Sequence, residues 1–111
     1  IRKLRPEATK KNQAYWGLYR CISRLWYAAT DNTLDQELEN LKVFFWKNKE
    51  YISHEVQEIY HEIYDRFYDF ETWKYDIDKS IKVTEQNSVS MKKLENLIIS
   101  ETSYRNIKKY K

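Results

Sequence analysis

Glycine, proline and cysteine are nearly absent from this chain. Among 111 residues there is one of each, Gly17, Pro6 and Cys21. Glycine and proline make most hairpin turns and phosphate-binding loops, so their scarcity argues against a β-rich fold and against glycine-rich ligand loops. A single cysteine cannot form an internal disulfide, which excludes a small disulfide-stabilised secreted domain and favours a reducing compartment such as the cytoplasm.

Long hydrophobic runs are also missing. Apolar runs such as residues 43–46 are far shorter than the roughly 20 residues that a membrane-spanning helix needs. The length predicts one domain over residues 1–111. The chain begins at Ile1, followed by basic residues in the pattern of a cytoplasmic flank after a transmembrane helix. The sequence therefore leaves open that the domain is the soluble part of a longer, membrane-anchored protein.

Aromatic and charged residues are abundant instead. Charged residues make up 33% of the chain, and four Trp, ten Tyr and four Phe supply large apolar side chains. A composition with so many aromatic residues can build a hydrophobic core in spite of its high charge. We therefore expect a folded protein and not a disordered one.

Apolar residues recur at steps of three and four, the spacing of one face of a helix. Thr33 with Gln36 has the pattern of a capping box, Ser53 is a candidate N-cap, and the polar residues 84–90 predict a loop. The fold class is all-α, an elongated antiparallel bundle of four helices, with three long helices plus a short crossing one as the alternative. The predicted helices span about 7–29, 33–48, 53–82 and 88–108.

Charge is unevenly distributed along the chain. Residues 1–30 and 81–111 carry net charges of +6 and +4, whereas residues 31–80 carry −7. One expectation is charge pairing between helices inside the bundle. The other is a basic surface for nucleic-acid phosphates or an anionic membrane, with Tyr15, Trp16 and Tyr19 as faces on which bases stack. The candidate anion contacts are Arg2, Lys3, Arg5, Lys10, Lys11, Arg20 and Arg24.

No complete catalytic or metal site is found. Glu58 and His61 form one Glu-x-x-His step of the kind that di-iron bundles use, but the second step is missing. His54, Glu58, His61 and Asp65 share one helix face, which is more typical of a solvated acidic surface than of a zinc site. Cys21 has no base close in sequence and is interpreted as a small core residue. We therefore predict no enzyme, no metal, no cofactor and no small-molecule substrate.

An aromatic flank on the predicted third helix is the candidate partner surface. Its members lie beside the aliphatic stripe, where they either widen the core or bind a protein partner or a second copy. They are Tyr60, Tyr64, Tyr68, Trp73 and Tyr75. The function expected from these features is that of a non-enzymatic helical interaction domain, regulatory or scaffolding. The alternative is a small nucleic-acid-binding protein that uses the basic N-terminal helix.

Overall fold

The computed structural model describes residues 6–102, and all regular secondary structure in this part of the chain is helical. The predicted all-α fold is therefore confirmed. No helix among these residues combines the length and the apolar character that crossing a bilayer requires. The main helices are α1 (Pro6–Asp31), α2 (Leu34–Asn48), α3 (His54–Tyr68) and α5 (Ile77–Thr102), with a 3-10 turn η1 (Lys49–Tyr51) and a short α4 (Phe70–Trp73) between them.

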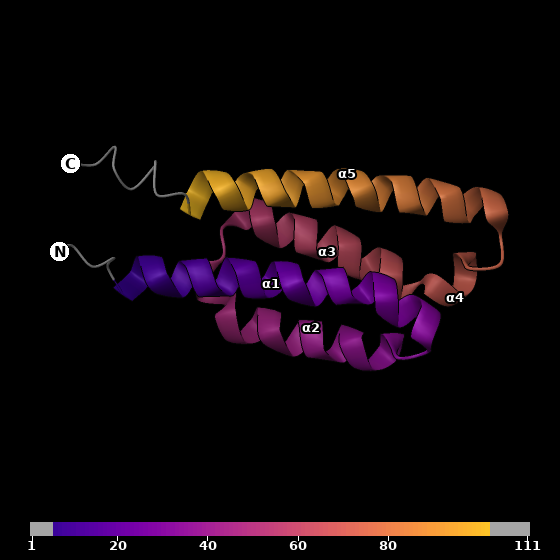
Figure 1. The fold of residues 1–111 in the computed structure, drawn as a ribbon, viewed down its shortest axis with the longest axis horizontal. Helices are drawn as coiled ribbons and strands as arrows, with labels where there is room; N and C mark the ends of the chain where they lie inside the picture. Colours follow the sequence, from indigo (N-terminus) through magenta and orange to yellow (C-terminus); the bar gives the residue numbers. More distant parts are fainter. Residues whose placement is uncertain (1–5, 103–111) are drawn as a thin grey trace.

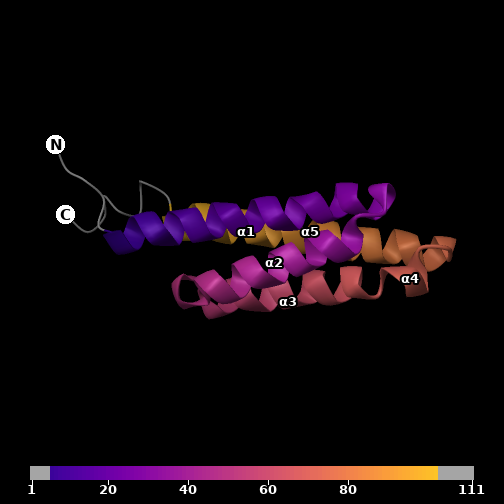
Figure 2. The same ribbon diagram turned by 90° about the horizontal axis from the view of Figure 1, so that it is seen from below.

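The helices form two layers (Figures 1 and 2). In one layer α1 and α5 run antiparallel, so that the start of α1 and the end of α5 lie at the same end of the molecule (Figure 1). The second layer contains α2 and α3, with α2 packed against α1 and α3 against α5. The bundle is elongated, as predicted, because α1 and α5 have 26 residues each and measure about 39 Å at 1.5 Å per residue.

Each main helix turns an apolar stripe toward the space between the layers. Burial of one such aliphatic side chain stabilises the fold by about 1.5–3 kcal/mol. The stripes contain Tyr15, Leu18, Ile22 and Leu25 from α1, Leu34, Leu38, Leu41 and Phe45 from α2, Val56, Ile59, Ile63 and Phe67 from α3, and Leu94 and Ile98 from α5. The three-and-four spacing that predicted the helices therefore identifies the core as well.

The single glycine lies where α1 packs against α2. Gly17 is buried, and a Cβ atom at this position would overlap the ring of Phe44. The glycine therefore makes room for the Phe44 ring in its present position. A tight turn connects α1 to α2. In this turn Asn32 has φ of 60°, the left-handed conformation that asparagine tolerates at the end of a helix.

One predicted cap is confirmed and one is wrong. The Ser53 hydroxyl accepts a hydrogen bond from the Val56 N–H at 3.4 Å, so Ser53 is the N-cap of α3. Thr33 makes no capping hydrogen bond with its side chain. Gln36 does not complete the capping box, because its amide donates to Asn40 instead.

The boundaries predicted for the last two helices are wrong. The predicted helix 53–82 ends at Tyr68, and α5 begins at Ile77, so the polar residues 84–90 are helical and not a loop. Asp76 caps the new start, since its carboxylate accepts the Lys79 N–H at 3.0 Å. The alternative with three long helices also fails, because only α1 and α5 are long. Residues 103–108 of the predicted fourth helix lie outside the described residues.

Two buried polar side chains explain why the polar stretch is helical. Asn87 and Ser90 face α3, where the Arg66 guanidinium donates to Asn87 Oδ1 at 3.1 Å and to Ser90 Oγ at 2.8 Å. A polar residue can be buried when it finds a hydrogen-bond partner. The stretch that looks like a loop is therefore the contact surface of α5 with α3.

Candidate interaction surface

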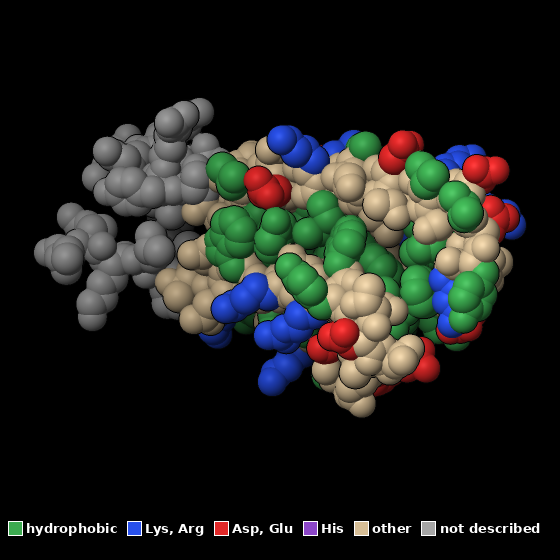
Figure 3. All heavy atoms as spheres, turned by 45° about the vertical axis from the view of Figure 1, so that its right-hand side comes forward, with side chains coloured by type: hydrophobic (Ala, Val, Ile, Leu, Met, Phe, Trp, Pro, Cys, Tyr) green, Lys and Arg blue, Asp and Glu red, His purple; other side chains and the backbone are tan. Residues whose placement is uncertain are grey.

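A shallow groove runs between α1 and α5 on the outer side of their layer (Figure 3). Its floor contains Trp26, whose ring packs edge-on against Phe67 in α3 with 5.0 Å between centroids, and the half-buried Met91. Hydrophobic side chains, green in Figure 3, gather between the two helices. The groove is lined by Ser23, Trp26, Tyr27 and Thr30 from α1 and by Ser88, Met91, Lys92 and Glu95 from α5.

Large apolar side chains on this face are exposed to solvent. Tyr27, in the groove, is 74% exposed. Ile99 is 50% exposed and follows Glu95 by one helical turn, and Ile81 precedes Ser88 by two turns on the same side of α5. Exposed apolar side chains are therefore present on this side of α5 beyond both ends of the groove.

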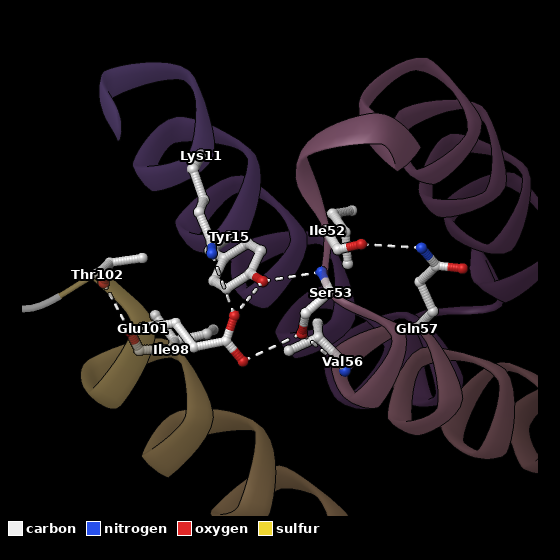
Figure 4. A network of polar contacts seen from close by, with 9 residues as sticks. All are labelled: Lys11, Tyr15, Ile52, Ser53, Val56, Gln57, Ile98, Glu101 and Thr102. Carbon is white, nitrogen blue, oxygen red and sulfur yellow. Dashed lines mark hydrogen bonds and ion pairs between the residues drawn. The ribbon is translucent and has the colours of Figure 1, made fainter. Parts of the chain in front are cut away.

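A polar network ties the helices together near the start of α1 (Figure 4). The Tyr15 hydroxyl donates to Glu101 Oε1 at 2.6 Å and accepts the Ser53 N–H at 2.8 Å. The Ser53 hydroxyl donates to Glu101 Oε2 at 3.0 Å, and Lys11 Nζ lies 3.3 Å from Glu101 Oε1. Burial, together with the hydrogen bond to Glu101, raises the pKa of Tyr15 to about 12. These contacts join α1, α5 and the start of α3.

A second side-chain contact, a hydrogen bond, links α1 and α5 at the groove itself. The Tyr19 hydroxyl donates to Glu95 Oε2 at 3.1 Å, and burial raises the pKa of Tyr19. The Trp16 ring packs edge-on against Tyr19, with 5.7 Å between centroids. Because α1 and α5 are linked at two levels, the spacing between them is set before anything binds.

Positive charge flanks the groove. Arg20 and Arg24 are exposed on the outer side of α1, and the exposed Lys92 lies on α5. Among the described residues, the only ion pair between two main helices is that of Lys11 with Glu101. The other pairs join residues three or four apart, so the charge pairing expected between helices is limited to one contact.

The structure separates the predicted anion contacts. Lys10 is exposed and lies over the Tyr51 ring at 5.9 Å, whereas Lys11 is half-buried and engaged with Glu101. Arg20 and Arg24 share the outer side of α1 with Trp16. Tyr15 is fully buried, so it cannot stack on a base. The remaining three predicted contacts, Arg2, Lys3 and Arg5, lie outside the described residues.

The predicted aromatic flank does not form one surface. Tyr60 is 2% exposed and stacks on Phe45 with 3.9 Å between ring centroids, so its prediction as a surface residue is wrong. Burial raises its pKa as well. Trp73 is half-buried, and its indole N–H donates to the Arg66 carbonyl at 2.8 Å. Tyr64 is half-buried beside the exposed Tyr68, and the exposed Tyr75 follows α4.

The residues considered for metal binding and catalysis are not among those that line the groove. His54 Nε2 lies 2.8 Å from Glu58 Oε1 on the surface, and the His61 ring packs edge-on against Phe45. Among the side chains that the structure describes, those of residues 9–102, no three of His, Cys, Asp or Glu are arranged to hold a metal ion. Cys21 is half-buried, and burial raises the pKa of its thiol, which opposes formation of the nucleophilic thiolate.

Comparisons with known proteins give no match: no family model, curated protein or solved structure is similar to this chain. The groove therefore has to be interpreted from its own residues.

Sequence reasoning did not single out Tyr27, Met91, Lys92 or Glu95. One signal was available, because Trp26 and Tyr27 are consecutive and successive residues on a helix point about 100° apart. Two consecutive rings cannot both point at the centre of the core, so this pair favours exposure of one of them.

Proposed function

We propose that this protein is a non-enzymatic helical interaction module, regulatory or scaffolding, that binds a protein partner along the groove between α1 and α5. The observation that carries the proposal is the exposure of Tyr27 and neighbouring apolar side chains in a groove whose walls are already linked. Contiguous apolar surface of this kind typically marks an interaction site. A free Cys21 is compatible with a cytoplasmic location.

The chemistry of the groove supports protein binding in particular. Tyrosine and tryptophan supply large contact areas at low conformational cost and are enriched among the residues that dominate binding energy. Met91 adds a flexible apolar side chain that adapts to different partners. Because the Tyr19 to Glu95 hydrogen bond and the Tyr15 network fix the helix spacing, a partner does not have to open the groove. Preformed sites lose less free energy on binding.

Nucleic-acid binding is the second candidate. Trp16, Arg20 and Arg24 follow one another at four-residue steps on the outer side of α1 and are exposed, a combination that suits a single-stranded backbone with stacked bases. Burial of Tyr15 and the engagement of Tyr19 with Glu95 leave Trp16 as the one available ring among the three that the sequence suggested. One ring supports less stacking than a platform does, so we rank this function second.

Site-specific photo-crosslinking tests the leading proposal. A benzophenone amino acid is placed at position 27 in the full chain, in cells that naturally express it. We expect irradiation to give protein adducts of discrete mass, because Tyr27 lies in the groove and is exposed. The matched control is the same substitution at Tyr68, which is 70% exposed on α3.

The pattern of adducts decides between the outcomes. Adducts at position 27 that are absent at position 68 support the groove as a docking site. Equal adducts at both positions, or none at position 27, contradict it. Adducts to nucleic acid at position 27 support the second candidate instead.

A further inference from the structure

We infer that the occupant of the α1–α5 groove is an amphipathic α-helix with acidic residues beside its apolar stripe, on the flank that faces α1. This inference rests on the proposed function and adds the chemical class of the partner. It draws on three observations, namely the shape of the groove, the charges along its rims and the charges of the rest of the chain.

The shape of the groove favours a helix. Both walls are α-helices, whose backbone hydrogen bonds are satisfied internally, so no sheet edge is present to which a partner strand could add. Two helices side by side present a long furrow, and a third helix fills it with side chains spaced at three and four residues. On the α5 side, Ile81, Met91 and Ile99 offer apolar contacts to such a helix near the two ends and the middle of the groove.

The α1 rim of the groove favours negative charge in a partner. Arg20 and Arg24 are exposed and precede Tyr27 by seven and three residues, so they lie on the same side of α1 as this groove residue. Lys and Arg side chains, blue in Figure 3, gather along the lower edge of the hydrophobic surface. The α5 side has mixed charge, because the exposed Lys92 follows the exposed Glu85 by seven residues. The acidic residue of the groove, Glu95, is already engaged with Tyr19. Carboxylates on the flank of a docked helix that faces α1 would meet Arg20 and Arg24, which raises specificity and association rate.

The protein itself does not supply a complementary surface. A two-fold dimer through this face would place the same surface, with Arg20, Arg24 and Lys92, against itself, and like charges at an interface cost binding energy. An acidic strip exists on α3, where Glu55, Glu58 and Glu62 are exposed, but its use would join unlike surfaces head to tail and produce rings or open chains instead of a two-fold dimer. Residues 1–5 and 103–111 contain seven Lys or Arg and no acidic residue, so they do not carry the charge that the groove requires. A separate acidic partner fits better.

A displayed peptide library tests the inference directly. The probes are helix-forming peptides of about 20 residues, which span roughly 30 Å. Each has a fixed leucine stripe, and the flanking positions encode Glu, Lys or Ser with equal frequency. Against the full chain we expect enrichment of Glu at the flanking positions. We also expect the selected peptides to bind at least about tenfold more weakly when Arg20→Glu and Arg24→Glu are combined.

A matched charge reversal on another helix is the control. Lys42→Glu with Lys47→Glu changes the net charge equally on the exposed side of α2 and should leave both affinity and the preference for Glu unchanged. The variant Tyr27→Asp should abolish selection, and helical circular dichroism checks that each variant is folded.

The results separate failure of this inference from failure of the proposed function. Peptides that bind, depend on Tyr27 and show no preference for Glu overturn the acidic partner and leave the groove as a docking site. If no peptide binds the wild type better than Tyr27→Asp, the groove itself is contradicted. Binding of a single-stranded oligonucleotide that is lost in the Arg20 and Arg24 reversal, with no peptide selected, overturns both in favour of nucleic acid.

Discussion

Tyr15 combines full burial with a hydroxyl that bridges three segments of the chain. A buried hydroxyl without partners would cost free energy, but here it donates to Glu101 and accepts the Ser53 N–H at the same time. The ring fills the core while the oxygen holds the end of α5 against α1. One residue therefore contributes both to stability and to the spacing of the groove.

The variant Tyr15→Phe keeps the ring and removes this bridge. We expect the free energy of unfolding to fall by about 1–3 kcal/mol at neutral pH, because the Ser53 N–H and the Glu101 carboxylate lose a partner. Urea denaturation measures the change. The control is Tyr19→Phe, which removes one hydrogen bond from a half-buried position and should cost less.

The stability difference between the wild type and Tyr15→Phe should also depend on pH. Burial raises the folded-state pKa of Tyr15 from 10.0 to about 12, so the unfolded chain loses this proton at lower pH than the folded one. The stability that Tyr15 contributes is present below pH 10 and is lost as pH rises through about 12. The difference between wild type and Tyr15→Phe should therefore shrink over that range. A difference that stays constant would contradict the assigned burial.

At the scale of the elements, α1 and α2 could be predicted from the sequence and the later boundaries could not. The apolar spacing continues across the true break between Tyr68 and Ile77, and spacing alone does not show where a chain reverses. The polar residues 84–90 look like a loop because polar side chains usually face solvent. Whether they can be buried depends on Arg66, which is distant in sequence and meets Asn87 only in the folded protein.

The candidate site could likewise be predicted from the sequence only in part. Trp26 and Tyr27 point about 100° apart on their helix, so greater exposure of one ring than of the other could have been predicted there. The groove could not, because it depends on which helix lies beside α1. The bridge of Tyr15 to Glu101 joins residues 86 positions apart and becomes visible only when α5 is placed.

The contact of α3 with α5 can be tested through Arg66. We expect Arg66→Met to destabilise the protein by about 1–3 kcal/mol in urea denaturation, because the buried Asn87 and Ser90 lose the donor that they share. Replacing all three polar groups, as in Arg66→Met with Asn87→Leu and Ser90→Ala, should recover much of the loss. Lys42→Met, at an exposed position on α2, is the control for removal of a cation. A triple variant as unstable as the single one would contradict this account.

For the whole molecule, the two layers carry different surfaces. The α1–α5 face combines exposed apolar residues with Arg20, Arg24 and Lys92, whereas α3 displays acidic side chains. Few of these charges are paired between helices in the described part of the chain. Charge that is not neutralised internally acts at the surface, where it steers partners and keeps copies of the protein apart.

Self-association should therefore depend on salt. At low ionic strength we expect light scattering to give the mass of a monomer, 13.7 kDa, because two copies joined through the apolar face would place the same cationic surface, with Arg20 and Arg24, against itself. In 1 M NaCl the screening length falls to about 3 Å, so the repulsion weakens while the apolar attraction remains, and the mean mass should rise. Neutralising the rim with Arg20→Gln and Arg24→Gln should raise the mass already at low salt, and adding Tyr27→Asp should reverse this. A stable dimer of the wild type at low salt that Tyr27→Asp dissociates would make a second copy the occupant of the groove.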